Sequence, residues 1–188
     1  MEIESYIKAY KTRSLQALST ISEETVARLV RLLAGARDAR HQVFVCGNGG
    51  SAATASHFAN DLGKGASFGR EKKFRVLSLT DNVPWISALA NDLEYADIFV
   101  EQLKNYAEPG DSLIAFSGSG NSRNIIRVVE WANDAGLTTI GITGRPGGRL
   151  AQLSMLPIFV ESSHMGNIEE GHFLIQHLVA YYFMENTD

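Results

Sequence analysis

Short apolar runs alternate along the chain with longer stretches in which apolar residues recur at helical spacing. The runs are expected to form strands at 43–46, 74–79, 112–116, 138–143 and 156–160. They are apolar throughout rather than alternately apolar and polar, which is typical of strands buried on both faces. The alternation of strands and helices favours a parallel sheet. The pattern therefore predicts an α/β fold with helices on both faces of a parallel sheet.

The expected helices differ in length. They run from Ser51 to near Gly63 and Gly65, from Pro84 to about Ala90, over 96–106, from Ser122 onward, over 150–153 and from about Gly166 to Met184. We expect Asn91 and Asp92 to break the second of them. Ser51 and Ser122 each stand at a plausible helix N-cap, because a serine hydroxyl can accept a hydrogen bond from the first turn.

Residues 1–37 precede the first strand signal and are expected to form two helices. Ser22 can cap the second, because Glu23 and Glu24 follow in its first turn. The two apolar faces look larger than one edge of a small sheet would cover, so we expect this pair to pack in an oligomer. An intrachain cap on the sheet is the alternative. Residues 38–188 would form the α/β core of a single domain spanning 1–188.

A glycine-rich turn joins the first strand to the helix that follows it. Gly47, Gly49 and Gly50 let a ligand approach the main chain, and Asn48 and Ser51 add polar side chains. The free amides at the start of that helix, with its dipole, suit an anion such as phosphate. A tight connection that binds nothing is one alternative. The loose dinucleotide pattern G-x-G-x-x-[GA] is another.

A second loop of the same kind, SGSGNS at 117–122, follows the third strand. Ser117, Ser119 and Ser122 offer hydroxyl groups, while Gly118 and Gly120 leave backbone amides accessible. In an open parallel sheet both loops lie beyond the carboxyl ends of strands, where ligands bind. A dinucleotide would leave the second loop without a role, and no Walker pattern occurs. Two hydroxyl-rich loops suit a sugar phosphate better.

Composition and charge narrow the class of protein further. The formal net charge of −4, without a long basic tract, disfavours nonspecific nucleic-acid binding. No apolar run reaches the ~20 residues of a membrane helix, and the first ten residues lack a signal peptide's apolar centre, so a cytoplasmic protein is expected. Cys46 is the only cysteine, which excludes an intrachain disulfide and a cysteine-based zinc cage. We expect it to be a small buried hydrophobe rather than a nucleophile.

An ordered set of segments carries a resemblance to a known family. CGNGGSAATASHFANDL, SLTDN, ALAND, SGSGNS and IEEGHFLIQH together resemble the sugar isomerase (SIS) domain, specifically the phosphoheptose isomerase family. The resemblance covers nearly the whole chain. It implies a flavodoxin-like, three-layer α/β/α sandwich around a five-stranded parallel sheet, and a homotetramer with sites shared between subunits. It also implies an aldose-ketose isomerase that converts sedoheptulose 7-phosphate to D-glycero-D-manno-heptose 7-phosphate.

The resemblance assigns roles to individual positions. Phosphate and sugar hydroxyls would be held by Asn48, Gly49, Gly50, Ser51, Asn91, Asp92, Ser117, Gly118, Ser119 and Ser122. The zinc ligands and acid-base residues fall on His57, Asp61, Glu169 and His177, with Asp61 and His177 exchanging protons and Glu169 or zinc polarising the carbonyl. The sequence departs from better-known members twice, because Asp61 replaces a glutamate and Glu169 replaces a glutamine.

Elementary chemistry supports part of this assignment. His57 and Asp61 are spaced i, i+4 and share a helix face. A carboxylate and a histidine with pKa values near the working pH are useful for moving a proton between adjacent carbons through an enediol. The same residue types suit zinc, although a metal-free site is equally open. Glu169 and His177 lie about 80° apart in helical projection, whereas Glu170 and His177 nearly eclipse, so Glu170 is a rival to Glu169.

Other interpretations remain beside these. His57 could merely hydrogen-bond the glycine loop, His172 is expected to be structural, and His164 could be a surface residue or reach a neighbouring site. A noncatalytic SIS protein that binds a replication-initiator-type partner, or one that senses a sugar phosphate, is the alternative function. Retention of the acid and of the last histidine favours catalysis.

Overall fold

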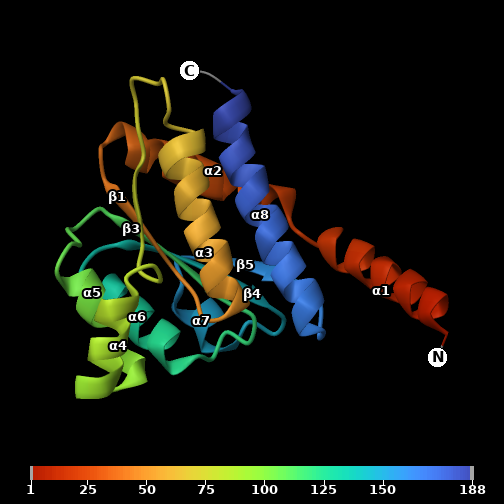
Figure 1. The fold of residues 1–188 in the computed structure, drawn as a ribbon. Helices are drawn as coiled ribbons and strands as arrows, with labels where there is room; N and C mark the ends of the chain where they lie inside the picture. Colours follow the sequence, from red (N-terminus) through yellow and green to blue (C-terminus); the bar gives the residue numbers. More distant parts are fainter. Residues whose placement is uncertain (1, 187–188) are drawn as a thin grey trace.

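The computed structural model describes residues 2–186, which form a five-stranded, all-parallel sheet in the order β2-β1-β3-β4-β5 (Figure 1). The strands are β1 Gln42–Cys46, β2 Arg75–Ser78, β3 Ser112–Ser117, β4 Thr138–Gly144 and β5 Leu156–Val160. Val45 of β1 lies opposite Ser78 of β2 and Ile114 of β3, which fixes the register at the centre of the sheet. The predicted five-stranded parallel sheet is confirmed.

The helices cover both faces of this sheet. They are α1 Ile3–Leu18, α2 Glu23–Asp38, α3 Gly50–Asn60, α4 Val83–Asp92, α5 Val100–Lys104, α6 Arg123–Asp134, α7 Gly148–Leu153 and α8 Met165–Glu185, with a π-helix η1 Asp61–Gly65 and a 3₁₀ turn η2 Tyr95–Asp97. No helix within residues 2–186 has the length and apolar character to cross a membrane.

Alternate residues of each central strand build two separate cores. In β1, Val43 and Val45 pack with α2, α3 and α8, whereas Phe44 and Cys46 pack with α5, α6 and α7. Successive side chains of a strand point to opposite faces, so a fully apolar strand needs a helical layer on each side. The three-layer α/β/α arrangement expected from the sequence is confirmed (Figure 1).

Three local predictions were wrong. Asn91 and Asp92 do not break a helix, since α4 continues through Asp92 and ends at Leu93. The helix expected over 96–106 is divided into η2 and the shorter α5. Ser51 is the second residue of α3, and Gly49 is its N-cap with φ of 55°. Glycine tolerates this positive φ without strain, so the chain turns into the helix before Ser51.

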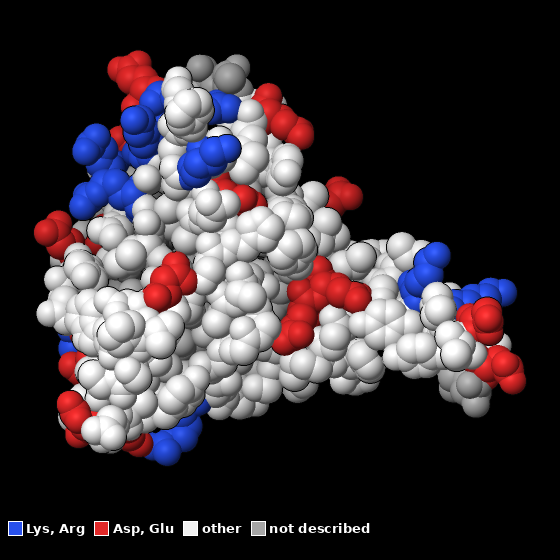
Figure 2. Space-filling view, in the orientation of Figure 1, with Lys and Arg blue, Asp and Glu red and all other residues white. Residues whose placement is uncertain are grey.

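The two leading helices differ in how they pack. Ser22 accepts a hydrogen bond from the amide of Thr25 and so caps α2, whose Leu29 and Leu33 are fully buried in the core. Helix α2 therefore caps the sheet within the chain, which was the alternative interpretation. Helix α1 rests on α8 and projects from the body, with charged side chains at its free end (Figure 2). Its apolar residues Ile3, Ile7 and Leu15 stay exposed.

Candidate active site

The strand order places the two serine- and glycine-rich loops together. After β1 the chain passes to α3 on one face of the sheet, and after the neighbouring β3 it passes to α6 on the other face. Connections that leave adjacent strands in opposite directions open a crevice beyond the carboxyl ends of those strands, which is where ligands bind in such sheets. The loops at 47–49 and 118–122 flank this crevice.

The first loop is shaped by close approaches of other atoms to its glycines. A side chain at Gly47 would meet the backbone of Ser51 at 2.5 Å. A Cβ on Gly50 would lie 2.6 Å from Oε1 of Glu169. The carboxylate of Glu169 on α8 thus lies against the first turn of α3, where the helix dipole favours a negative charge.

The second loop holds its own serines at different depths. The buried Ser117 accepts a hydrogen bond from the Gly120 amide at 3.2 Å, and its hydroxyl lies 3.4 Å from that of Ser122. Ser122 is the N-cap of α6, as predicted, although the structure gives it no side-chain capping bond within the described residues. Ser119 is exposed and accepts from the Asn121 amide at 3.2 Å. Ser119 is therefore the exposed hydroxyl of this loop, and Ser122 is a partly buried one.

Asn124 and Tyr95, which the sequence analysis did not single out, both bond to Asn48 of the first loop. Asn48 of the first loop and the buried Asn124 of α6 exchange two amide hydrogen bonds of 2.9 and 2.8 Å. The hydroxyl of Tyr95 donates to Oδ1 of Asn48 at 3.0 Å. Asn91 and Asp92, at the exposed end of α4, bond to each other at 2.9 Å, three residues before Tyr95. The signal for Asn124 was its place in the first turn of α6, beside the serine loop.

A carboxylate and two imidazoles meet at the far end of α3. Oδ2 of Asp61 lies 3.2 Å from Nε2 of His57 and 3.9 Å from Nε2 of His177. The two imidazole rings are nearly perpendicular, with centroids 5.1 Å apart. One ligand atom from each residue lies within 4.8 Å of the others, so the three could hold a metal ion. The i, i+4 prediction for His57 and Asp61 is confirmed.

The buried carboxylate of Asp61 tests whether a metal suits this cluster. Its Oδ2 atom is buried and has no hydrogen-bond partner among the described residues. A buried polar atom without a partner is costly, so such atoms commonly bind water or an ion. Two imidazole nitrogens and one carboxylate oxygen are a donor set that zinc accepts, with a further position left for water or substrate. The residues present therefore fit zinc.

The adjacent glutamates of α8 are directed to different helices. Glu170 accepts hydrogen bonds from Tyr10 at 2.9 Å and from Asn167 at 3.2 Å, which places it against α1. Glu169 faces Gly50 instead, and within residues 2–186 it does not join the cluster of His57, Asp61 and His177. Because α8 is helical from Met165 onward, the angular separation of Glu169 and His177 stands. The structure thus brings together three of the four expected ligands.

The remaining candidate groups have structural surroundings. His172 is fully buried beside Phe116, and burial lowers its pKa to about 4, so it is neutral near pH 7. His164 is the N-cap of α8 and meets Tyr10 edge-on at 5.6 Å. Burial also raises the pKa of the Cys46 thiol, which excludes a reactive thiolate there. Cys46 is the buried hydrophobe that its position predicted.

Comparison with known proteins defines the class first. A family model described as the SIS domain matches residues 5–144. Solved structures agree, since the chain superimposes on a phosphoheptose isomerase from Francisella tularensis with a TM-score of 0.92 and 29% identity, covering 99% of this chain and 100% of the other. The phosphoheptose isomerase of Neisseria gonorrhoeae superimposes with a TM-score of 0.90 and 26% identity, covering 98% of this chain and 100% of the other.

Sequence relatives then define the group within that class. The phosphoheptose isomerase of Mycobacterium bovis (strain BCG / Pasteur 1173P2) is 41% identical over 150 residues, which are 80% of this chain and 76% of the relative. The phosphoheptose isomerase of Helicobacter pylori (strain P12) is 33% identical over 168 residues, which are 89% of this chain and 85% of the relative. The chain belongs to the phosphoheptose isomerase family of SIS-domain proteins, and it is a sugar-phosphate isomerase.

Proposed function

We propose that this isomerase interconverts sedoheptulose 7-phosphate and D-glycero-D-manno-heptose 7-phosphate through an enediol. The observation that carries the proposal is the position of Asp61. Its carboxylate lies near both His57 and His177, at the C-terminal end of the helix that starts at the first glycine loop. A carboxylate and an imidazole on one substrate face are the groups that proton transfer between adjacent carbons requires.

The proposed reaction moves a hydrogen from C1 to C2 and leaves the composition of the sugar phosphate unchanged. Asp61 removes a proton from C1 of the ketose, the C1–C2 double bond forms, and the C2 carbonyl oxygen takes up a proton to give the enediol. The hydroxyl on C1 then loses its proton while C2 gains one, which yields the aldose. In this scheme Asp61 and His177 carry the protons, and Glu169, beside Gly50, hydrogen-bonds the sugar hydroxyls.

Zinc is the metal we propose for the cluster of His57, Asp61 and His177, because these residues supply two nitrogens and one oxygen within 4.8 Å of one another. When bound, zinc would supply Lewis acidity that polarises the substrate carbonyl. With zinc bound, Asp61 and His177 would each be a ligand as well as a proton carrier. Each would then bind the metal through one atom and carry the proton on the other, which is the second carboxylate oxygen of Asp61 and the second ring nitrogen of His177.

The two loops would divide the substrate between them. The Glu169 carboxylate already lies at the first turn of α3, so a phosphate there would meet a like charge. We therefore place the phosphate at the second loop, on Ser119, Ser122 and the amides at the start of α6. Asn48 to Ser51 would take sugar hydroxyls, and Asn91 and Asp92 would line the entrance near Tyr95.

Proton exchange observed by NMR tests the proposal directly. Purified protein is incubated with sedoheptulose 7-phosphate in heavy water, with and without added zinc. We expect an aldose heptose phosphate that carries deuterium at C2, and the comparison shows whether metal is needed. A folded protein that gives neither exchange nor product in both conditions would contradict this substrate and mechanism.

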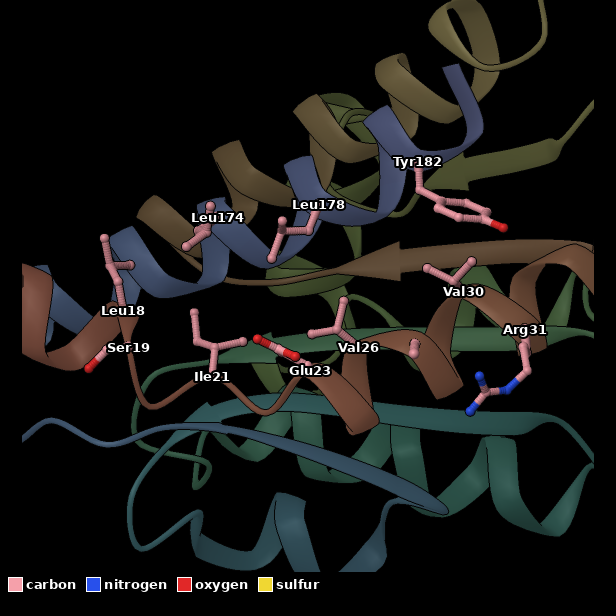
Figure 3. Close-up of a pocket in the computed structure, with 11 residues that line it drawn as sticks. Leu18, Ser19, Ile21, Glu23, Val26, Val30, Arg31, Leu174, Leu178 and Tyr182 are labelled. Carbon is pink, nitrogen blue, oxygen red and sulfur yellow. The ribbon is translucent and has the colours of Figure 1, made fainter. Parts of the chain in front are cut away.

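We also propose that the chain, as one SIS unit, assembles into a homotetramer with shared sites. An apolar groove of about 580 Å³ between α2 and α8 supports this, and none of the cluster residues lines it. Figure 3 shows Leu174 and Leu178 of α8 on one side, and Val26 of α2 with Ile21 of the turn before α2 on the other. Light scattering after size-exclusion chromatography should give about four times the 20.6 kDa chain mass. A monomer at micromolar concentration would contradict the assembly.

A further inference from the structure

The carboxamides of Asn48 and Asn124 form a closed pair between the two loops. Nδ2 of Asn48 donates to Oδ1 of Asn124 at 2.9 Å, and Nδ2 of Asn124 donates to Oδ1 of Asn48 at 2.8 Å. Asn124 is 2% exposed, whereas Asn48 is only partly buried at the crevice. An amide oxygen and an amide nitrogen have similar shapes, so the orientation of each carboxamide must be argued from its hydrogen bonds.

A backbone group determines the orientation of this pair. The amide of Ile125, which can only donate, donates to Oδ1 of Asn124 at 3.0 Å. Reversing Asn124 would set its NH₂ group against that amide, with two donors facing each other in a buried place. The oxygen of Asn124 is therefore fixed toward Ile125, and the pairing then fixes Asn48 with its nitrogen toward this oxygen.

Tyr95 completes the arrangement from the other side. Its hydroxyl donates to Oδ1 of Asn48 at 3.0 Å, and its side chain lies on η2, after the exposed end of α4. The oxygen of Asn48 thus receives two donors and has no further lone pair to offer, since a carbonyl oxygen has two. One N–H of Asn48 is used by Asn124, so within the described residues one N–H remains without a partner.

We propose that Asn124 and Tyr95 are positioning residues that turn Asn48 into a hydrogen-bond donor toward the bound sugar phosphate. The inference rests on the proposed function for the identity of the substrate and adds how this subsite selects it. The subsite recognises an acceptor, which is a sugar hydroxyl or carbonyl oxygen, and rejects a group that can only donate. Neither positioning residue needs to touch the substrate.

Steady-state kinetics with a double-mutant cycle tests this role. Tyr95→Phe removes one donor to Asn48, and we expect KM for sedoheptulose 7-phosphate to rise roughly three- to tenfold with kcat nearly unchanged, as for a lost neutral hydrogen bond that binds ground and transition state alike. Tyr106→Phe is the matched control, because Tyr106 is also about half exposed and packs edge-on against Trp85. In an Asn48→Ala background the effect of Tyr95→Phe should vanish.

Three kinetic results would contradict the positioning role of Tyr95. An unchanged KM in Tyr95→Phe, or an effect that persists when Asn48 is alanine, would overturn the positioning role, since Tyr95 would then act by itself or not at all. A fall in kcat with an unchanged KM would overturn it too.

A readout in the free protein separates this inference from the proposed function. The pair exists without substrate, so the side-chain amide signals of Asn48 in a ¹⁵N–¹H spectrum should shift in Tyr95→Phe and in Asn124→Ser but not in Tyr106→Phe. Signals that do not move in the first two variants would overturn the inference. If they move while sedoheptulose 7-phosphate is not turned over, only the substrate assignment fails.

Discussion

The hydroxyl of Tyr10 donates a 2.9 Å hydrogen bond to Oε1 of Glu170 and so ties the projecting helix α1 to the first turns of α8. Asn167 donates to the other oxygen of the same carboxylate at 3.2 Å. Glu169, the preceding residue, is turned about 100° around the helix and faces Gly50 of α3. Of the two adjacent glutamates, Glu170 therefore packs against α1 and Glu169 lies beside the first glycine loop.

The stability contributed by Glu170 should depend on pH. Burial opposes its charge, but hydrogen bonds from Ser14, Asn167 and Tyr10 hold the pKa of Glu170 below its usual 4.5. A carboxyl whose folded pKa is lowered stabilises the fold above the unfolded pKa, and this contribution is lost as the pH falls through the folded pKa. We expect Glu170→Gln to have a lower urea midpoint than wild type at pH 7. Below about pH 4.5 the midpoint of wild type should fall further than that of Glu170→Gln, because only wild type loses a stabilising carboxylate. Equal pH profiles would contradict the network.

Gly50→Ala should disturb the site more than the fold. The new Cβ would meet the Glu169 carboxylate, which is the flexible end of a side chain and can move aside. We expect the melting temperature to change little and activity to fall severalfold, because the carboxylate leaves the first turn of α3.

The companion variant Glu169→Ala gives the control for this prediction. With the carboxylate absent, adding alanine at Gly50 should cost little further activity. A full additional loss would show that the alanine acts on the loop itself rather than through Glu169.

The sequence could predict the sheet and both loops because each depends on local patterns. Fully apolar runs predicted five parallel strands, and glycine and serine clusters predicted the turns that follow two of them. The i, i+4 spacing of His57 and Asp61 was enough to place them on one face of α3. The boundaries of α4 and α5 were missed, since tertiary packing overrides the turn preference of Asn91 and Asp92.

Contacts between distant segments could not be derived from the sequence. The α-helical part of α3 ends at Asn60, and Asp61 starts a π-turn in which the Ala66 amide bonds to the Asp61 carbonyl at 2.8 Å. Such turns carry no reliable sequence pattern and occur often at functional sites. The choice between Glu169 and Glu170 likewise depended on Tyr10, about 160 positions away.

Asp61→Asn and His177→Ala should each abolish isomerisation while leaving the fold intact. Asparagine keeps the shape of Asp61 but cannot accept a proton, and loss of general acid-base catalysis costs about 10²- to 10⁴-fold. Turnover of sedoheptulose 7-phosphate, with circular dichroism for the fold, checks this. Asp134→Asn at the exposed end of α6 is the matched control. Turnover like that of wild type in either variant would remove that residue from the mechanism.

Zinc should bind to the cluster of His57, Asp61 and His177 and stabilise the protein. A ligand that binds only the folded state raises the melting temperature, and the increase grows with the logarithm of the free ligand concentration once this exceeds Kd. We expect zinc to raise the melting temperature of metal-stripped wild type and to do so much less in His57→Ala. Calorimetric titration should give about one ion per chain, because residues 2–186 contain one such cluster. Equal shifts in both proteins would place the zinc elsewhere.

His172 should destabilise the protein in mild acid. Its ring is fully buried, both nitrogens lack partners among the described residues, and burial lowers its pKa to about 4. The unfolded chain therefore binds a proton between about pH 6.5 and pH 4 that the folded chain does not, so stability falls as the pH drops through that window. Each unit of pKa difference corresponds to about 1.4 kcal/mol, which makes the loss about 3 kcal/mol by pH 4.

His172→Phe keeps a ring against Phe116 and removes the titrating group. We expect its urea midpoint to equal or exceed that of wild type at pH 7, and its advantage to grow steadily toward pH 4.5. A wild-type profile that is flat across this range would show that His172 is hydrated or protonated in the folded state.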